Sequence, residues 1–146
     1  MKWLSFNCKG MASSPKNLAL RRLFESESIN IIFLQETLGE VDLTSHTLSS
    51  LKPSWIFQSL DVIGRSSGLA LGYNPRTINL RASWGGAGFI GMDIFSSELG
   101  MDLCIINVYG PCHNIEAFWS RFLNLSITSS ENLIIDGDLN FSIRYG

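Results

Sequence analysis

Four apolar, strand-like runs in this chain each end in a polar residue that suits phosphate chemistry. In an α/β sheet, the loops that leave the carboxyl ends of neighbouring strands converge on one rim. Residues far apart in the sequence can therefore share one pocket. The four endings are Phe6-Asn7, Leu34-Gln35-Glu36-Thr37, Asn107-Val108-Tyr109 and Ile135-Asp136-Gly137-Asp138-Leu139-Asn140. The candidate site residues that they supply are Asn7, Glu36, Tyr109, Asp138 and Asn140.

The first third of the chain has the pattern of a strand, a helix and a second strand. Residues 2–7 alternate apolar and polar positions, and an amphipathic helix is expected over about 15–28. Residues 29–34 are almost uniformly apolar and rich in β-branched side chains, which is typical of a strand covered on both faces. This order predicts a right-handed crossover that joins two parallel strands.

The rest of the chain predicts closely spaced strands, which favour antiparallel hairpins, with two further helices. We find no internal repeat or linker, so one α/β domain, or part of one, is expected. A turn is expected at Gly85-Gly86-Ala87-Gly88. The predicted helices cover residues 44–52 and 116–125, and the predicted strands cover 55–60, 69–73, 78–83, 89–95, 103–109 and 132–136.

The charge of the chain excludes a broad basic surface of the kind that binds nucleic acid. The formal net charge is −2 and the sequence pI is about 5.6. A phosphate substrate would therefore need a local positive site, which a metal ion held by carboxylates can provide. Clustered arginines at Arg21 and Arg22 are interpreted as a solvated helix face.

Three cysteines and the absence of a long apolar run indicate where such a chain would reside. Cys8, Cys104 and Cys112 lack the spacing of a disulfide framework or a zinc site, so we expect buried or half-buried thiols in a reducing compartment. No run approaches the roughly 18 apolar residues of a membrane span, and no targeting segment is seen. We expect a soluble intracellular protein, nuclear or cytoplasmic, with no membrane association.

Each candidate site residue also has a simpler structural interpretation. Glu36 could be a solvent-facing loop glutamate, and Asn7 could cap the loop that follows its strand. Tyr109 could be an amphipathic core residue whose hydroxyl contacts solvent. The segment from Gly137 to Asn140 could be an Asx-type turn, although Asp138 and Asn140, two residues apart in extended chain, would point the same way.

The combination favours a site over these separate interpretations. All the candidates follow predicted strands, and their chemical types are complementary. Carboxylate and amide oxygens suit a hard, octahedral cation such as Mg²⁺. A tyrosine hydroxyl and an asparagine amide can donate hydrogen bonds to phosphate oxygens.

Five sequence blocks occur in order along nearly the whole chain. They are Ser5-Phe6-Asn7-Cys8-Lys9-Gly10, Phe33-Leu34-Gln35-Glu36-Thr37, Gly64-Arg65-Ser66-Ser67-Gly68-Leu69-Ala70, Asn107-Val108-Tyr109-Gly110-Pro111 and Gly137-Asp138-Leu139-Asn140. These blocks resemble the motifs of the endonuclease/exonuclease/phosphatase superfamily. Within it the chain is most similar to the endonuclease domains of plant LINE-type retrotransposons, which are related to apurinic/apyrimidinic endonucleases and pancreatic deoxyribonuclease.

The resemblance implies a two-sheet α/β sandwich, deoxyribonuclease-like, and Mg²⁺-dependent hydrolysis of phosphodiesters in DNA, with Mn²⁺ as a substitute ion. It implies that Glu36 is the principal metal ligand, with Asn7 beside it at the metal and phosphate. Tyr109 would contact the phosphate. Asp138 would orient or deprotonate the attacking water, and Asn140 would help to hold the pentacovalent phosphate.

The chain departs from the family pattern after its last motif. Family members continue to another aspartate and a Ser-Asp-His-like segment, and neither has a counterpart here. We therefore expect residues 1–146 to be the amino-terminal portion of the domain, with weak or no activity and with uncovered sheet edges that favour self-association. His113, four residues after Tyr109, has no identified carboxylate partner, and His46 lies in a predicted polar helix, so neither is expected to replace the missing histidine.

Three functions stay open at this point. The first is a truncated DNA endonuclease derived from a retrotransposon. The second is a phosphomonoesterase of the same superfamily that acts on a lipid or inositol phosphate. The third is a non-catalytic remnant or interaction module.

Overall fold

The computed structural model describes residues 1–10, 14–26, 28–38, 41–60, 68–111, 113–125 and 132–139. Every predicted helix and strand is present, with ends that differ by a few residues from those expected. In chain order the elements are β1 (Trp3–Asn7), α1 (Ser14–Ser26), β2 (Ile31–Gln35), α2 (Val41–Leu51), β3 (Ile56–Leu60), β4 (Leu69–Tyr73), β5 (Ile78–Gly86), β6 (Phe89–Ser96), β7 (Met101–Tyr109), α3 (Ile115–Leu123) and β8 (Leu133–Asp138).

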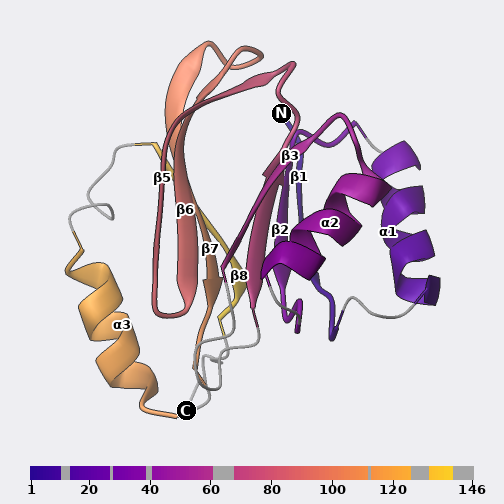
Figure 1. The fold of residues 1–146 in the computed structure, drawn as a ribbon. Coiled ribbons are helices and arrows are strands. Elements are labelled where there is room, and N and C mark those ends of the chain that lie inside the picture. The colour runs from indigo at the N-terminus through magenta and orange to yellow at the C-terminus, as the bar shows by residue number, and fades with distance from the viewer. Residues whose placement is uncertain are drawn as a thin grey trace, which may run out of the picture.

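The strands form two four-stranded sheets that face each other (Figure 1). The first has the order β1-β2-β4-β3, and the second has the order β5-β6-β7-β8. The pairs β1/β2 and β7/β8 are parallel, and the other neighbours are antiparallel. Helices α1 and α2 lie outside the first sheet, and α3 lies outside the second (Figure 1). The predicted α/β sandwich is confirmed.

Burial explains why two strands are apolar throughout. Every residue of β2 and of β4 is buried. Alternate side chains of β2, such as Ile32 and Leu34, pack with residues of α1 and α2, whereas Ile31 and Phe33 pack between the sheets. A strand covered on both faces cannot alternate apolar and polar residues, so the run at 29–34 was interpreted correctly.

A third cluster of apolar side chains joins α3 to the outer face of the second sheet. Phe122 is 2% exposed and packs against Phe89, with ring centroids 5.5 Å apart. Phe118 and Trp119 complete the contact between helix and sheet. The helical spacing of aromatic residues in this segment therefore marks a packing face.

Two strands extend further than the sequence predicted. Strand β5 runs to Gly86, and the turn falls at Ala87 and Gly88. A Cβ at Gly86 would meet the Phe89 ring, so the missing side chain leaves room for that ring in the paired strand. Strand β8 runs to Asp138, two residues beyond its predicted end, which makes Gly137 and Asp138 strand residues instead of a turn.

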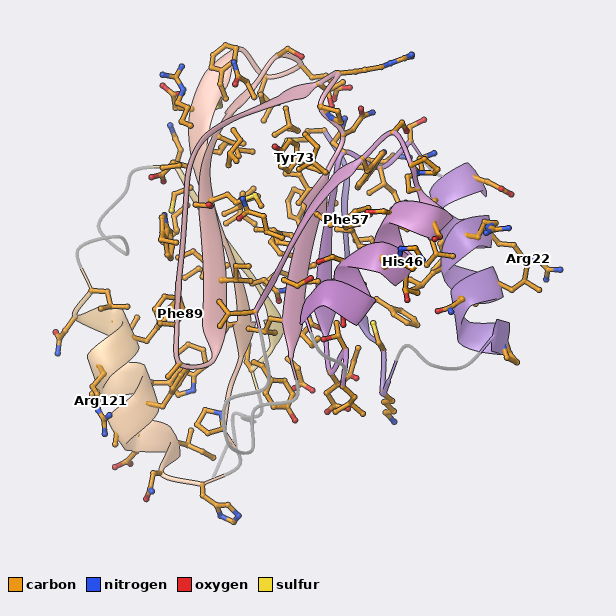
Figure 2. The ribbon with its side chains drawn as sticks, in the orientation of Figure 1. Arg22, His46, Phe57, Tyr73, Phe89 and Arg121 are labelled. Atoms are coloured by element: carbon orange, nitrogen blue, oxygen red, sulfur yellow. The ribbon has the colours of Figure 1, made fainter. Side chains whose placement is uncertain are left out.

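Buried polar groups tie the two sheets together at the end of the sandwich that holds the amino terminus. Asn30 is 5% exposed, accepts a hydrogen bond from the Lys2 backbone at 2.9 Å, and donates one to the Thr77 hydroxyl at 2.8 Å. The terminal ammonium of Met1 lies 3.3 Å from a Glu98 carboxylate oxygen. Tyr73 of β4 is also buried between the sheets near this end (Figure 2).

The sequence also predicted the surroundings of the cysteines and of the paired arginines. Cys8 and Cys104 are buried and form no disulfide, as expected, and Cys112 lies outside the described residues. Arg21 and Arg22 are exposed, and Figure 2 shows Arg22 directed outward from α1. Within the described ranges, no helix is long and apolar enough to cross a membrane.

Candidate active site

Four strands deliver their carboxyl ends to one rim of the sandwich, which lies at the lower end in Figure 1. In the first sheet, Asn7 at the end of β1 pairs with Gln35 at the end of β2. In the second sheet, Tyr109 at the end of β7 pairs with Asp138 at the end of β8. Because both pairs are parallel, their carboxyl ends point the same way.

Two hydrogen bonds connect the sheets at this rim. The Asn7 Nδ2 donates to Asp138 Oδ2 at 3.1 Å, and the Tyr109 hydroxyl donates to Glu36 Oε1 at 3.0 Å. Asn7 pairs with Gln35, the residue before Glu36, and Tyr109 pairs with Asp138. The two hydrogen bonds and the two strand pairings therefore connect Asn7, Glu36, Tyr109 and Asp138 in a ring. Four of the five predicted site residues therefore lie together, and Asn140 falls outside the described residues.

Glu36 lies in a strained turn directly after a buried strand. Its φ is 51°, in the left-handed region that a side chain makes unfavourable by about 1–2 kcal/mol. The turn is held on both sides: the Gly10 backbone N–H donates to the Glu36 carbonyl at 2.7 Å, and the Thr37 N–H donates to the Gly68 carbonyl at 3.4 Å. The half-buried carboxylate is thereby directed to the rim and toward Tyr109.

Asn7 caps the loop after β1 and also contacts the second sheet. Its Oδ1 accepts a hydrogen bond from the Lys9 backbone N–H at 3.1 Å, so it caps the loop after β1. Its Nδ2 is directed to Asp138. The loop contact fixes the side-chain amide, and the amide contacts the carboxylate.

Glycines let the ends of β7 and β8 approach closely beside Asp138. Gly137 has a φ of 136°, and a Cβ there would clash with the Val108 carbonyl oxygen. The Gly110 N–H donates to the Asp138 carbonyl at 2.7 Å, and a Cβ on Gly110 would clash with the Leu139 backbone. The glycine before Asp138 is thus required for the close contact between the strands.

Further polar residues, which the strand-end pattern did not predict, lie beneath the rim. Gln35 and Asn107 are both buried and bond to each other between the sheets. The Trp3 indole Nε1 donates to Asp136 Oδ2 at 3.0 Å, which adds a further side-chain hydrogen bond between the sheets. The signal that could have found the first pair is an amide side chain inside an otherwise apolar strand.

The histidines lie away from this ring. His46 is exposed on α2 (Figure 2). His113 is exposed and lines a separate pocket of about 300 Å³ against α3, together with Phe118 and Arg121. No contact between either histidine and the four rim residues is seen in the described part of the chain.

The rim residues fit a divalent cation that keeps part of its water shell. Among the described residues, no three or more histidine, cysteine or acidic side chains lie together in a group that could hold a metal ion. Mg²⁺ does not need such a cage, because it is usually bound through one or two carboxylates and several waters. Glu36 Oε2 has no hydrogen bond within the described ranges, and Glu36 is half-buried, so this oxygen can accept a cation.

Comparison with known proteins identifies the fold. No family model and no curated protein matches the sequence. Among solved structures, D. rerio TDP2 with a single-stranded DNA product is 16% identical with a TM-score of 0.75, and the match covers 96% of this chain and 61% of that one. The mannosyl-6-phosphatase Bt3783 of Bacteroides thetaiotaomicron is 11% identical with a TM-score of 0.69, covering 94% of this chain and 64% of that one.

A third structure is the endonuclease domain of TRAS1, a telomere-specific non-LTR retrotransposon. It is 12% identical with a TM-score of 0.67, covering 95% of this chain and 60% of that one. Two further matches, from Bacteroides, carry the name endonuclease/exonuclease/phosphatase. The chain has the endonuclease/exonuclease/phosphatase fold.

The likeness to proteins of the endonuclease/exonuclease/phosphatase fold is one of fold, because every identity is low. In the three structures described, the chain spans less than two thirds of the matched chain.

Proposed function

We propose that this chain is a divalent-cation-dependent phosphodiesterase-type domain that acts on DNA, derived from a retrotransposon endonuclease of the plant LINE type. The observation that carries the proposal is the ring of Asn7, Glu36, Tyr109 and Asp138, closed by two hydrogen bonds between the sheets. Support for a nucleic-acid substrate comes from two structures of the same fold, TDP2 with its single-stranded DNA product and the TRAS1 endonuclease domain.

In this proposal each rim residue has one task. Glu36 and the Asn7 amide oxygen would hold Mg²⁺, or Mn²⁺ in its place, and a bound cation would supply positive charge at the phosphate and the leaving oxygen. Tyr109 would turn its hydroxyl from Glu36 to donate a hydrogen bond to a phosphate oxygen. Asp138 accepts a proton from the attacking water or orients that water, and Asn140 helps to hold the phosphate during displacement.

We propose that the activity of residues 1–146 alone is weak. The sequence lacks a counterpart of the Ser-Asp-His-like segment that the family resemblance leads us to expect. Without it, one set of contacts to the scissile phosphate is missing. We also propose an intracellular location, in the nucleus or the cytoplasm, because Cys8 and Cys104 are buried and form no disulfide.

Relaxation of a supercoiled plasmid in Mg²⁺ tests the proposal. We expect slow nicking that depends on Mg²⁺ and is lost in Glu36→Gln and Asp138→Asn. Glu116→Gln, which changes an exposed glutamate in the first turn of α3, is the matched control and should nick like the unchanged chain. Nicking that survives Glu36→Gln would contradict the site, and rapid nicking would contradict the weak-activity proposal.

A phosphomonoesterase is the second candidate, favoured by the fold shared with the mannosyl-6-phosphatase. It predicts release of inorganic phosphate from a lipid, inositol or sugar monophosphate, dependent on Glu36, with no effect on DNA. The third candidate, a non-catalytic interaction module, predicts partner binding that persists in Glu36→Ala and Asp138→Ala. Measuring both activities on the same preparations separates the three.

We also propose that the chain associates with itself through its sheet edges. In the described part of the chain, β1 and β8 are edge strands of the two sheets, and they lie side by side. The Lys2 carbonyl accepts hydrogen bonds from the Asn30 and Ile31 N–H groups, and the Cys8 N–H donates to the Gln35 carbonyl. Because successive peptide groups of a strand point to opposite sides, those of Trp3, Ser5 and Asn7 point away from β2. Outward peptide groups at an edge can pair with another chain.

A further inference from the structure

Two amide side chains are buried between the sheets directly beneath the rim. Asn107 of β7 is 0% exposed and Gln35 of β2 is 2% exposed. Both point into the space between the sheets, where the neighbouring positions Ile105 and Phe33 are apolar and fully buried. A buried amide costs stability unless its donors and acceptors are paired, so this pair requires an explanation beyond filling space.

Hydrogen bonds pair the Asn107 amide completely. Its Nδ2 donates to the backbone carbonyls of Leu34 at 2.9 Å and Ala70 at 2.8 Å, which belong to neighbouring strands of the opposite sheet. Its Oδ1 accepts from Gln35 Nε2 at 2.9 Å. Gln35 Nε2 also donates to the Ser5 hydroxyl at 3.1 Å. One side chain of the second sheet therefore contacts three strands of the first, directly or through Gln35.

Only one orientation of the Asn107 amide satisfies these partners. Its NH₂ group faces two carbonyl oxygens, and its oxygen faces an NH₂ donor. Rotating the amide by half a turn would set oxygen against oxygen at two contacts. The bonds therefore fix both the spacing of the sheets and their relative position, which apolar contacts alone specify less sharply.

The bridge adjoins the residues of the rim. Gln35 immediately precedes Glu36, and Asn107 lies two residues before Tyr109 on the same face of β7. The bond between Gln35 and Asn107 and the bond between Glu36 and Tyr109 are thus successive links across one gap.

We infer that Gln35 and Asn107 are positioning residues, which hold Glu36 and Tyr109 at the separation that cation and phosphate binding needs. The part that concerns cation binding rests on the proposed function. The part that concerns the contact between Glu36 and Tyr109 does not.

The contact can be measured without any cation by labelling tyrosine with fluorine and recording the ¹⁹F NMR signal. The chain has three tyrosines, so Tyr109→Phe assigns the signal of Tyr109. Glu36→Gln then gives the signal of Tyr109 with its acceptor altered. Asn107→Leu, which keeps the shape of the side chain and removes its hydrogen bonds, should move or broaden the Tyr109 signal away from its position in the unchanged chain.

Mn²⁺ titration followed by electron paramagnetic resonance is the second measurement. We expect Asn107→Leu to weaken Mn²⁺ binding by about tenfold or more, as loss of an outer support of a metal site does. Ile105→Val is the matched control, since Ile105 is fully buried on the same face of β7 but has no part in the bridge. This control should lower stability and leave the Tyr109 signal and Mn²⁺ affinity unchanged.

A double variant separates positioning from stability. Asn107→Leu with Gln35→Met replaces both amides by apolar side chains of similar shape, which should recover part of the stability lost in Asn107→Leu. We expect the Tyr109 signal and Mn²⁺ affinity to stay perturbed in the double variant. Their recovery together with stability would show a merely structural bridge and overturn the inference.

Two further results have defined meanings. A Tyr109 signal that Asn107→Leu leaves unchanged, or that Ile105→Val moves equally, would overturn the inference. If the unchanged chain binds no Mn²⁺, the proposed function fails, and the ¹⁹F signals alone then decide whether the bridge holds Tyr109 in place.

Discussion

At the scale of single residues, the rim is built from backbone conformations that side chains disfavour. Glu36 has a φ of 51° and Lys9 has a φ of 47°, and both lie in loops that leave the first sheet at the rim. Hydrogen bonds to neighbouring loops hold these conformations. Strain that the surroundings maintain in this way is typical of functional sites.

Gly137 gives the sharpest prediction for one residue. Gly137→Ala should lower the free energy of unfolding by at least about 2 kcal/mol, because the new Cβ meets the Val108 carbonyl and the φ is positive. Gly100→Ala is the control: its φ is 64° but no atom lies within 4 Å of a Cβ, so the cost should be about 1 kcal/mol. Urea denaturation measures both, and equal losses would contradict the packing argument.

At the scale of elements, local patterns predicted the helices and strands well. The apolar run before Glu36 and the aromatic spacing in α3 each reflect one segment and the surface that covers it, so the sequence contains the signal. The end of β8 was predicted two residues early because Asp136 and Gly137 favour turns locally. Pairing with β7 overrides that preference.

The contacts between elements could not be predicted in the same way. The bond from Asn7 to Asp138 and the bond from Gln35 to Asn107 join residues far apart in the chain, and their existence depends on how two sheets face each other. The sequence placed Asn7 and Asp138 at strand ends, which was enough to expect a shared rim. It gave no sign of the partner that each side chain contacts.

Helix α3 provides a prediction at this scale. Phe122→Ala should lower the free energy of unfolding by about 3–5 kcal/mol, because Phe122 is 2% exposed and joins the helix to the second sheet. Leu123→Ala, at a neighbouring position that is 63% exposed, should cost less than about 0.5 kcal/mol. Thermal or urea unfolding distinguishes them. A small effect of Phe122→Ala would mean that α3 does not pack on the sheet as described.

At the scale of the whole molecule, the edge strands β1 and β8 lie together along one side of the sandwich. Self-association through this side should make the average mass in sedimentation equilibrium rise with protein concentration. Trp3→Pro removes an outward N–H at the first position of β1, where proline is tolerated, and should reduce the association.

Trp3→Phe is the matched control for this edge. It removes the indole bond to Asp136 but keeps the backbone N–H, so it should associate like the unchanged chain. A chain that is monomeric at all concentrations and unfolds cooperatively would contradict the proposal that it self-associates through these edges.

Direct titration with Mn²⁺ is the closest test of the proposal that side chains from both sheets form one divalent-cation site at the rim. We expect one bound Mn²⁺ per chain, with affinity reduced about tenfold or more by Glu36→Gln and unchanged by Glu116→Gln. Binding that Glu36→Gln does not weaken, or the absence of binding in the unchanged chain, would contradict it.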